Sequence, residues 1–312
     1  MTYFRPIPQS DPARPPAALP LAGGPLWFDR LERLERGRAP AIVPAADAPP
    51  GLLDRLAAPR APLAGLALDR PRLMGILNVT PDSFSDGGLR QDPALAAAMG
   101  RAMLAEGADL LDVGGESTRP GAREVPEAEE LSRILPVIRA LAGEALLSVD
   151  TRKAPVAEAA LRAGAKIVND VSGLRFDPAL AHAARDADAL VLTHSVGTPE
   201  TMQDDPRYDD VLLDVYDALE AALASAGAAG VRRERVLLDV GLGFGKTLQH
   251  NVSLLRRLSL YHALGCPLLV GASRKGFVGT LGGERDARAR APGSIAAALH
   301  AAPWWKWPEV WM

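Results

Sequence analysis

Short runs of apolar and β-branched residues recur from residue 73 onward, each followed by a polar turn and an alanine- and leucine-rich segment. The runs are continuous rather than alternating, which is typical of strands that are buried on both faces of a parallel sheet. The pattern therefore predicts seven buried strands, at residues 73–79, 108–114, 146–150, 166–170, 189–194, 235–241 and 267–273.

The segments between these runs carry signals for helix starts and ends. Residues 92–108 open with Asp92 and Pro93, an N-cap followed by proline at the first helical position, and reach Gly107 near their end. Residues 153–165 reach Gly164 in the same way. Alternating strands and helices predict an α/β fold, either an open doubly wound sheet or a closed (β/α)8 barrel.

Polar residues at the ends of the predicted strands favour the barrel. In a barrel all carboxyl ends of the strands meet at one mouth, whereas an open sheet uses only the few at its switch point. We therefore predict a TIM-type (β/α)8 barrel over residues 71–302, although only seven strands are found. The strand-end side chains are those of Asn78, Asp112, Asp150, Asn169, Asp170, His194, Asp239, Ser273, Arg274 and Lys275.

The two ends of the chain depart from this pattern. Residues 1–70 are rich in proline and alanine and predict an accessory extension or semi-rigid arm, with one helix-like patch at residues 29–37. Residues 303–312, PWWKWPEVWM, stand where an eighth strand is expected, but Pro303 and Pro308 suit a central strand poorly. We interpret the C-terminus as truncated or read in a shifted frame, so that the eighth strand and last helix are missing or replaced.

Composition narrows the function. A formal net charge of -3 gives no electrostatic footprint for nucleic acid or an anionic membrane. No apolar run approaches the roughly 20 residues that span a bilayer, and the first residues lack the apolar stretch of a signal peptide. Cys266, the single cysteine, lies in an apolar run and is interpreted as a buried thiol. These features predict a cytoplasmic protein without a nucleic-acid or membrane partner.

Two long polar loops follow the first two predicted strands. Residues 78–88 read NVTPDSFSDGG and residues 114–122 read GGESTRPGA. Two such loops over one barrel mouth predict closure around a substrate. The later stretch GLGFGKT suggests a nucleotide-binding P-loop, but the first glycine that this motif requires falls on Val240. The sequence also has no His/Cys metal cluster and no G-x-S-x-G motif.

Taken together, the motifs resemble the dihydropteroate synthase family of pterin-binding enzymes over residues 72–300. The first two segments are the most specific. The segments occur in the family's order, as NVTPDSFSDGG, DVGGESTRPGA, SVDTRK, AKIVNDVSG, GTPETMQ, GLGFGKT and GASRKGFVG.

The resemblance implies a transferase of folate biosynthesis that works as a homodimer. It condenses a 6-hydroxymethyl-7,8-dihydropterin diphosphate with p-aminobenzoate and releases pyrophosphate. The resemblance also implies that Asn78 ligates Mg²⁺, a hard cation that prefers oxygen ligands. Asn78, Asp150 and Lys275 would carry the catalytic step.

The remaining site residues also follow from the resemblance. Asp150, Asn169, Asp239 and Lys275 would form the pterin pocket, with Phe244 as its apolar wall. A carboxylate such as Asp239 can accept two adjacent N–H groups of an aminopyrimidine edge. The substrates would also meet Thr118, at the diphosphate, and Arg119 with Ser273, at the p-aminobenzoate.

Several alternatives stay open at this stage. The strand-end residues could form a structural polar network, and Asp112 and Asp170 could either touch ligand or orient their neighbours. His194 is interpreted as a packing or loop histidine. The protein could be a non-catalytic pterin-binding or partner protein, because residues 303–312 lack the Arg-x-His pair of the family's last strand. A methyltetrahydrofolate-type methyl-transfer domain would not be expected to combine TPDSFSDGG with STRPG.

Overall fold

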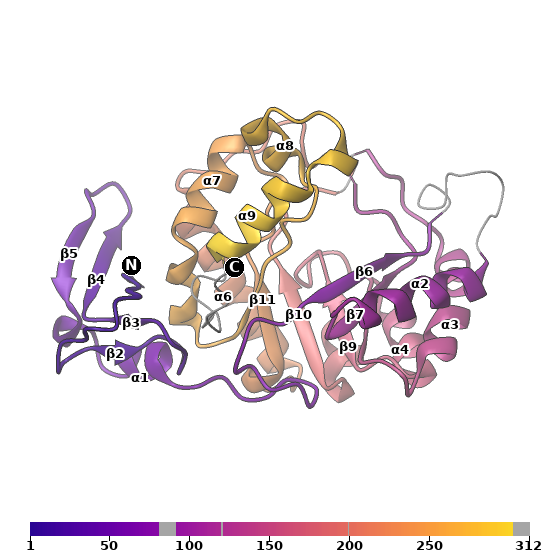
Figure 1. Cartoon of the computed structure of the whole chain (residues 1–312), viewed down its shortest axis with the longest axis horizontal. Helices are drawn as coiled ribbons and strands as arrows, with labels where there is room; N and C mark the ends of the chain where they lie inside the picture. The colour runs from indigo at the N-terminus through magenta and orange to yellow at the C-terminus, as the bar shows by residue number, and fades with distance from the viewer. Residues whose placement is uncertain (81–91, 120, 199, 302–312) are drawn as a thin grey trace, which may run out of the picture.

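The core of the protein is a parallel sheet of seven strands in chain order, seen in a computed structural model that describes residues 1–80, 92–119, 121–198 and 200–301 (Figure 1). Each predicted apolar run contains one strand, so this prediction is confirmed. The strands are β6 (Met74–Asn78), β7 (Leu110–Gly114), β8 (Leu147–Asp150), β9 (Ile167–Asp170), β10 (Ala189–Thr193), β11 (Val236–Asp239) and β12 (Leu268–Leu269).

Helices follow the strands and cover the sheet. The side chain of Asp92 accepts a hydrogen bond from the backbone of Ala94 at 2.8 Å and so caps the first of them, as predicted. The α-helices are α2 (Pro93–Ala105), α3 (Glu127–Leu141), α4 (Ala154–Ala163), α5 (Leu180–Ala183), α6 (Val211–Ala228), α7 (Leu248–Arg256), α8 (Gly276–Gly282) and α9 (Ala291–Ala301). Short 3-10 turns are η1 (Ala45–Asp47), η3 (Ala184–Asp186), η4 (Arg233–Arg235), η5 (Leu258–Leu264) and η6 (Ala287–Ala289).

The sheet curls as a TIM-type barrel does but stays open. Its order runs from β12 at one edge to β6 at the other, and no eighth strand joins these edges among the described residues. The predicted barrel without its eighth strand is therefore confirmed for the part of the chain that the structure describes. Residues 303–312, to which the C-terminal interpretation applies, lie outside that part.

The register of the strands aligns the predicted site residues. Asn78 pairs with Gly114, Gly114 with Asp150, and Asp150 with Asn169, so that these four positions form one row across β6 to β9. Paired residues of a parallel sheet face the same side. The row therefore brings three polar side chains to one face at the carboxyl ends of the strands.

The N-terminal extension is folded, which corrects the expectation of an irregular arm. It contains an antiparallel sheet of β1 (Thr2–Pro6), β4 (Arg30–Glu35) and β5 (Ala41–Pro44), a pair β2 (Leu19–Pro20) and β3 (Trp27–Phe28), and the short helix α1 (Leu52–Ala57). The helix expected at residues 29–37 is wrong. Leu31 and Leu34 are buried, and the segment pairs with β1 on one side and β5 on the other.

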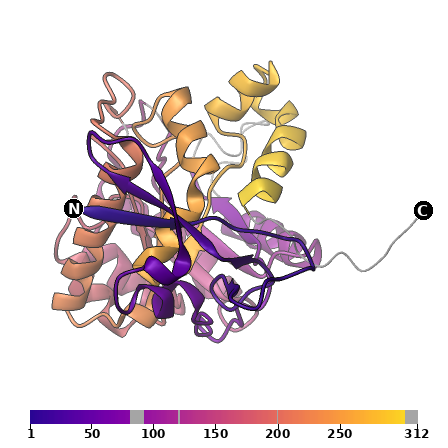
Figure 2. The same ribbon diagram turned by 90° about the vertical axis from the view of Figure 1, so that its left-hand side faces the viewer.

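Most of this extension packs on the outside of the barrel, against α6 and the turn η5 (Figures 1 and 2). The hydroxyl of Tyr3 donates to the Asp217 carboxylate on α6 at 2.8 Å, and the hydroxyl of Ser259 donates to the Pro6 carbonyl at 2.8 Å. Leu63 packs under the amino ends of the strands, beside Ile167. The division into residues 1–70, 71–302 and 303–312 stays a prediction.

Two further observations bear on the sequence analysis. Cys266 is a free, fully buried thiol, as predicted, and burial raises its pKa to about 11. None of the described helices has both the length and the apolar character that crossing a membrane requires.

Candidate active site

A group of buried hydrogen-bond acceptors lies at the carboxyl ends of the strands. We call it the acceptor pocket. The amide nitrogen of Asn169 donates to Oδ2 of Asp112 at 2.8 Å, but Asn169 Oδ1 and Asp112 Oδ1 are buried without a partner among the described residues. Buried acceptors without a donor are costly, so these atoms suit a ligand that presents N–H groups. The acceptor pocket consists of the four acceptors Asp112, Asp150, Asn169 and Asp239 together with one donor, Lys275.

The carboxyl groups of the acceptor pocket have raised pKa values. Burial raises the pKa of Asp112 and of Asp239. The nearby Ser148 hydroxyl and the Asn169 amide oppose the rise for Asp112, and the backbone N–H of Gly241, 2.8 Å from Asp239 Oδ1, opposes it for Asp239. Burial first and the neighbouring Asp112 second raise the pKa of Asp150 well above its usual value. Several perturbed carboxyl groups in one place are typical of functional sites.

Lys275 brings a cation to this group. Its Nζ lies 3.9 Å from the centroid of the Phe244 ring, a cation–π contact. Burial lowers the pKa of Lys275, whereas the charges of Asp239 and Asp150 raise it. The stem of Lys275 passes over Gly243, where an added Cβ would lie 3.1 Å from Lys275 Cδ. The ammonium group is thus held between the aromatic wall and two carboxyl groups.

Asn78 on β6 and Asp150 on β8 lie on either side of Gly114, which is on the strand between them, β7. A Cβ built on Gly114 would lie 3.3 Å from Asp150 Oδ2 and 3.6 Å from Asn78 Oδ1, so the glycine leaves both oxygens open. No group of three His, Cys, Asp or Glu side chains suits a metal within the described ranges. Mg²⁺ is commonly held by one or two protein oxygens together with substrate phosphates and water, and the pair fits that pattern.

A second charged cluster, which we call the ionic anchor, lies beside the acceptor pocket. Glu116 Oε1 accepts a hydrogen bond from Arg152 Nε at 2.8 Å and forms an ion pair with Arg152 Nη2 at 2.6 Å, and its other oxygen contacts Lys153. Lys153 also pairs with Glu130 at 2.7 Å. Each of these charges meets an opposite charge in a buried setting. The ionic anchor consists of Glu116, Glu130, Arg152 and Lys153, each less than 9% exposed.

The ionic anchor holds the base of the second polar loop. Glu116 precedes Thr118, which is half-buried, and Arg119, which is exposed. Neither residue, nor the exposed Ser273, forms a hydrogen bond to the acceptor pocket in the described part of the chain. The roles of Thr118, Arg119 and Ser273 as substrate contacts therefore stay predictions. Residues 81–91, which include most of the first polar loop, lie outside the described residues.

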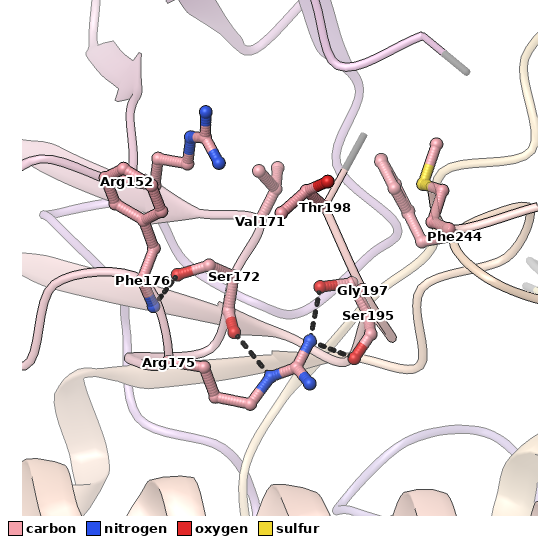
Figure 3. A pocket seen from close by; sticks show the side chains of 10 residues that line it. Arg152, Val171, Ser172, Arg175, Phe176, Ser195, Gly197, Thr198 and Phe244 are labelled. Carbon is pink, nitrogen blue, oxygen red and sulfur yellow. Dashed lines mark hydrogen bonds between the residues drawn. The ribbon is translucent and has the colours of Figure 1, made fainter. Parts of the chain in front are cut away.

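A cavity of about 240 Å³ is lined in part by Phe244, the residue whose ring contacts Lys275 (Figure 3). Its walls come from the loops after β8, β9, β10 and β11. The guanidinium of Arg152 lies 3.9 Å from the Phe176 ring centroid, and Arg175 donates to Ser195 Oγ at 2.9 Å. The sequence analysis did not single out these residues. Arg152, Arg175 and Phe176 could have been found from the sequence, because they lie just after two strand ends, in VDTRK and SGLRF.

Asp170 and His194, whose roles were open, are now placed. Asp170 accepts hydrogen bonds from Ser172 N at 2.7 Å and Leu174 N at 2.6 Å, so it holds a turn. His194 is buried and contacts Lys246, which agrees with the interpretation of a packing histidine. Asp112, by contrast, belongs to the acceptor pocket.

Comparisons with known proteins agree with this geometry. The pterin binding enzyme family matches residues 74–303. Dihydropteroate synthase from Neisseria meningitidis serogroup C is 48% identical over 241 residues, which are 76% of this chain and 85% of that protein.

Solved structures show the same likeness. Dihydropteroate synthase from Xanthomonas albilineans with 4-aminobenzoic acid is 48% identical, has a TM-score of 0.72 and is matched over 77% of this chain and 87% of that one. The complex of the enzyme from the same organism with 7,8-dihydropteroate is 45% identical, with a TM-score of 0.68, over 76% of this chain and 86% of that one. The resemblance seen in the sequence is therefore confirmed, and the chain belongs to the pterin-binding enzyme family, among its dihydropteroate synthases.

Proposed function

We propose that the chain condenses 6-hydroxymethyl-7,8-dihydropterin diphosphate with p-aminobenzoate, to give dihydropteroate and pyrophosphate, as a dihydropteroate synthase. The observation that carries the proposal is the acceptor pocket. Oδ1 of Asp112 and Oδ1 of Asn169 are buried without a hydrogen-bond partner in the described part of the chain, and they lie at the mouth of the barrel, where such folds keep their active sites. The pterin-binding relatives supply the substrate class.

The pterin fits the pocket by its N–H donors. An aminopyrimidine edge presents adjacent N–H groups, and the Asp239 carboxylate has Oδ2 and a free lone pair of Oδ1 to accept them. The Oδ1 atoms of Asn169 and Asp112 accept further donors of the ring system. The ligand thereby satisfies acceptors that the protein leaves open, which favours a pterin over an apolar ring.

The reaction then depends on position and charge. The aniline nitrogen of p-aminobenzoate attacks the methylene carbon, the bond from that carbon to the diphosphate oxygen breaks, and the nitrogen loses a proton to solvent. An aromatic amine is neutral near pH 7, so the attack needs no general base. Lys275, held on Phe244, donates to the pterin ring and keeps the methylene carbon in reach.

The proposal includes Mg²⁺. Asn78 and Asp150 would hold it through the two oxygens that flank Gly114. When bound, the ion neutralises charge that develops on the departing diphosphate. Thr118 is proposed to contact the diphosphate, and Arg119 with Ser273 to frame the p-aminobenzoate. We also propose a homodimer, on the basis of the family resemblance, and a cytoplasmic location, which a single free thiol fits.

Pyrophosphate release tests the proposal. The protein is incubated with the pterin diphosphate, with and without p-aminobenzoate, over a range of Mg²⁺ concentrations. Release that requires both substrates and rises with Mg²⁺ is expected. Pterin binding without release would instead support a non-catalytic pterin-binding protein, and release that ignores p-aminobenzoate would refute the condensation.

A further inference from the structure

Lys246, the lysine of the GLGFGKT motif, does not reach toward a phosphate. It lies inside the barrel wall, with 3% of its surface exposed. Its Nζ lies 3.0 Å from the Phe244 carbonyl, 3.2 Å from the His194 carbonyl and 3.0 Å from His194 Nδ1. Among the described residues, its hydrogen-bond partners are thus two backbone carbonyls and an imidazole rather than a carboxylate. A buried amine in such a setting is expensive, and the proposed reaction gives it no role.

The three acceptors of Lys246 belong to two different loops. His194 follows β10, and its backbone N–H donates to the Asp239 carbonyl at 2.9 Å. Phe244 follows β11, five residues after Asp239. The Lys246 amine therefore joins the loop after β10 to the loop after β11. Asp239, which is proposed to bind the pterin, is the last residue of β11. Burial lowers the pKa of His194 to about 2, so its neutral ring can accept the hydrogen bond.

The two loops also touch at Gly241. A Cβ on this residue would lie 1.9 Å from the His194 carbonyl oxygen, and its φ of +66° is in the region that favours glycine. Further bonds fix the rest of the loop: Tyr208 donates to the Gly245 carbonyl at 2.8 Å, and Gln203 to the Gly243 carbonyl at 2.6 Å. These contacts hold the loop after β11 in one conformation, and Lys246 supplies hydrogen bonds inside it.

We propose that Lys246 is a positioning residue, which joins the loops after β10 and β11 and so holds Phe244 in place against Lys275. The inference rests on the proposed function for the identity of the substrates. Lys246 acts through Phe244, whose ring carries the Lys275 ammonium at 3.9 Å. A shift of about 1 Å in a positioning group can reduce an enzyme's rate by up to roughly a hundredfold.

The test compares Lys246→Met with Thr247→Val. Lys246→Met keeps an unbranched side chain that is one atom shorter and removes every side-chain N–H donor. The KM for the pterin diphosphate should rise at least about tenfold, while the KM for p-aminobenzoate changes much less. Thr247 caps α7 in the same loop by accepting from His250 N at 3.2 Å. Thr247→Val should lower stability but leave the ratio of the two KM values as in the wild type.

A double substitution separates positioning from general damage. If Lys246 works through Phe244, then Lys246→Met should add little to the KM change that Phe244→Leu already causes. Additive effects, or equal rises in both KM values, would overturn the proposal. If Lys246→Met does not fold, Lys246→Leu, which also removes the side-chain N–H donors, is measured by the same criteria.

The proposal can fail separately from the proposed function. If the wild type releases no pyrophosphate, the function is wrong, and the Kd for 6-hydroxymethylpterin becomes the measurement. Lys246→Met should then weaken pterin binding about tenfold or more, and Thr247→Val should not. An unchanged Kd in Lys246→Met would reject the positioning role whatever the protein catalyses.

Discussion

The acceptor pocket and the ionic anchor use the same kinds of side chain at the same ends of the strands, but their contacts differ. In the ionic anchor, Glu116 is in contact with both Arg152 and Lys153. In the acceptor pocket, Asp112 and Asn169 each keep a buried oxygen without a partner among the described residues. Paired buried charges hold loops in place, whereas unpaired acceptors are suited to a ligand. Partners, more than residue types, distinguish the binding site from its support.

The largest effect is expected in the acceptor pocket. Asp239→Ala removes the carboxylate proposed to accept the pterin's N–H groups, so kcat/KM for the pterin diphosphate should fall by about a hundredfold or more. The melting temperature should change little, because Asp239 bonds only to Gly241 N among the described side-chain contacts. Steady-state kinetics and calorimetry measure the two quantities. Asp188→Ala, at the opposite end of the strands, is the matched control, and an equal loss there would contradict the assignment.

The ionic anchor should show the opposite pattern. Glu116→Ala leaves Arg152 and Lys153 buried with one partner fewer, so the free energy of unfolding should fall by about 3–5 kcal/mol. Urea denaturation measures it. At a temperature where the variant is folded, the KM for the pterin diphosphate should rise far less than in Asp239→Ala. Glu124→Ala is the control, since Glu124 is 59% exposed and 3.8 Å from Arg152. A large rise in KM without a loss of stability would show that Glu116 belongs to the binding site and not to its support.

The pH dependence of stability should distinguish the buried amine of Lys246 from the paired charges of the ionic anchor. Burial lowers its pKa to about 7, so between pH 7 and the ordinary lysine value the unfolded chain binds a proton that the folded chain does not. The contribution of Lys246 should therefore make stability rise with pH in that range, by roughly 1.4 kcal/mol per pH unit at most. Urea denaturation of the wild type and of Lys246→Met at several pH values isolates this slope. Identical slopes would show that the amine is not buried as described.

The smallest effect is expected away from both clusters. Tyr3→Phe removes the hydrogen bonds from the extension to Asp217 on α6 and should lower the free energy of unfolding by about 1 kcal/mol. Chemical denaturation provides the measurement. The kcat should not change, because neither Tyr3 nor Asp217 belongs to the acceptor pocket or to the ionic anchor. A drop in kcat would show that the extension influences the site.

Local patterns predicted the strands well because burial on both faces leaves a continuous apolar run. Val168, Leu190 and Leu238 are fully buried, and each lies within a predicted strand. The strands of the N-terminal extension were not predicted, because the segment RLERLE can form either a helix or a strand. The partners of Leu31 in β1 and β5 decided the outcome, and they lie elsewhere in the chain.

The candidate site could be predicted only in part. Strand ends revealed Asn78, Asp150, Asn169 and Asp239, because parallel strands bring their carboxyl ends together. Nothing local marks the bond from Asn169 to Asp112, 57 positions away, or the contact of Lys246 with His194, 52 positions away. Such pairs exist only after the sheet has formed, so no periodicity of the sequence encodes them.

Titration calorimetry with 6-hydroxymethyl-7,8-dihydropterin diphosphate tests the central claim most directly. The wild type, Asp239→Ala and Glu116→Gln are titrated side by side at a temperature where all three are folded. The wild type and Glu116→Gln should bind the pterin with similar affinity, and Asp239→Ala should show no measurable binding. Wild-type affinity in Asp239→Ala, or loss of binding in Glu116→Gln alone, would contradict the assignment of the acceptor pocket as the pterin site.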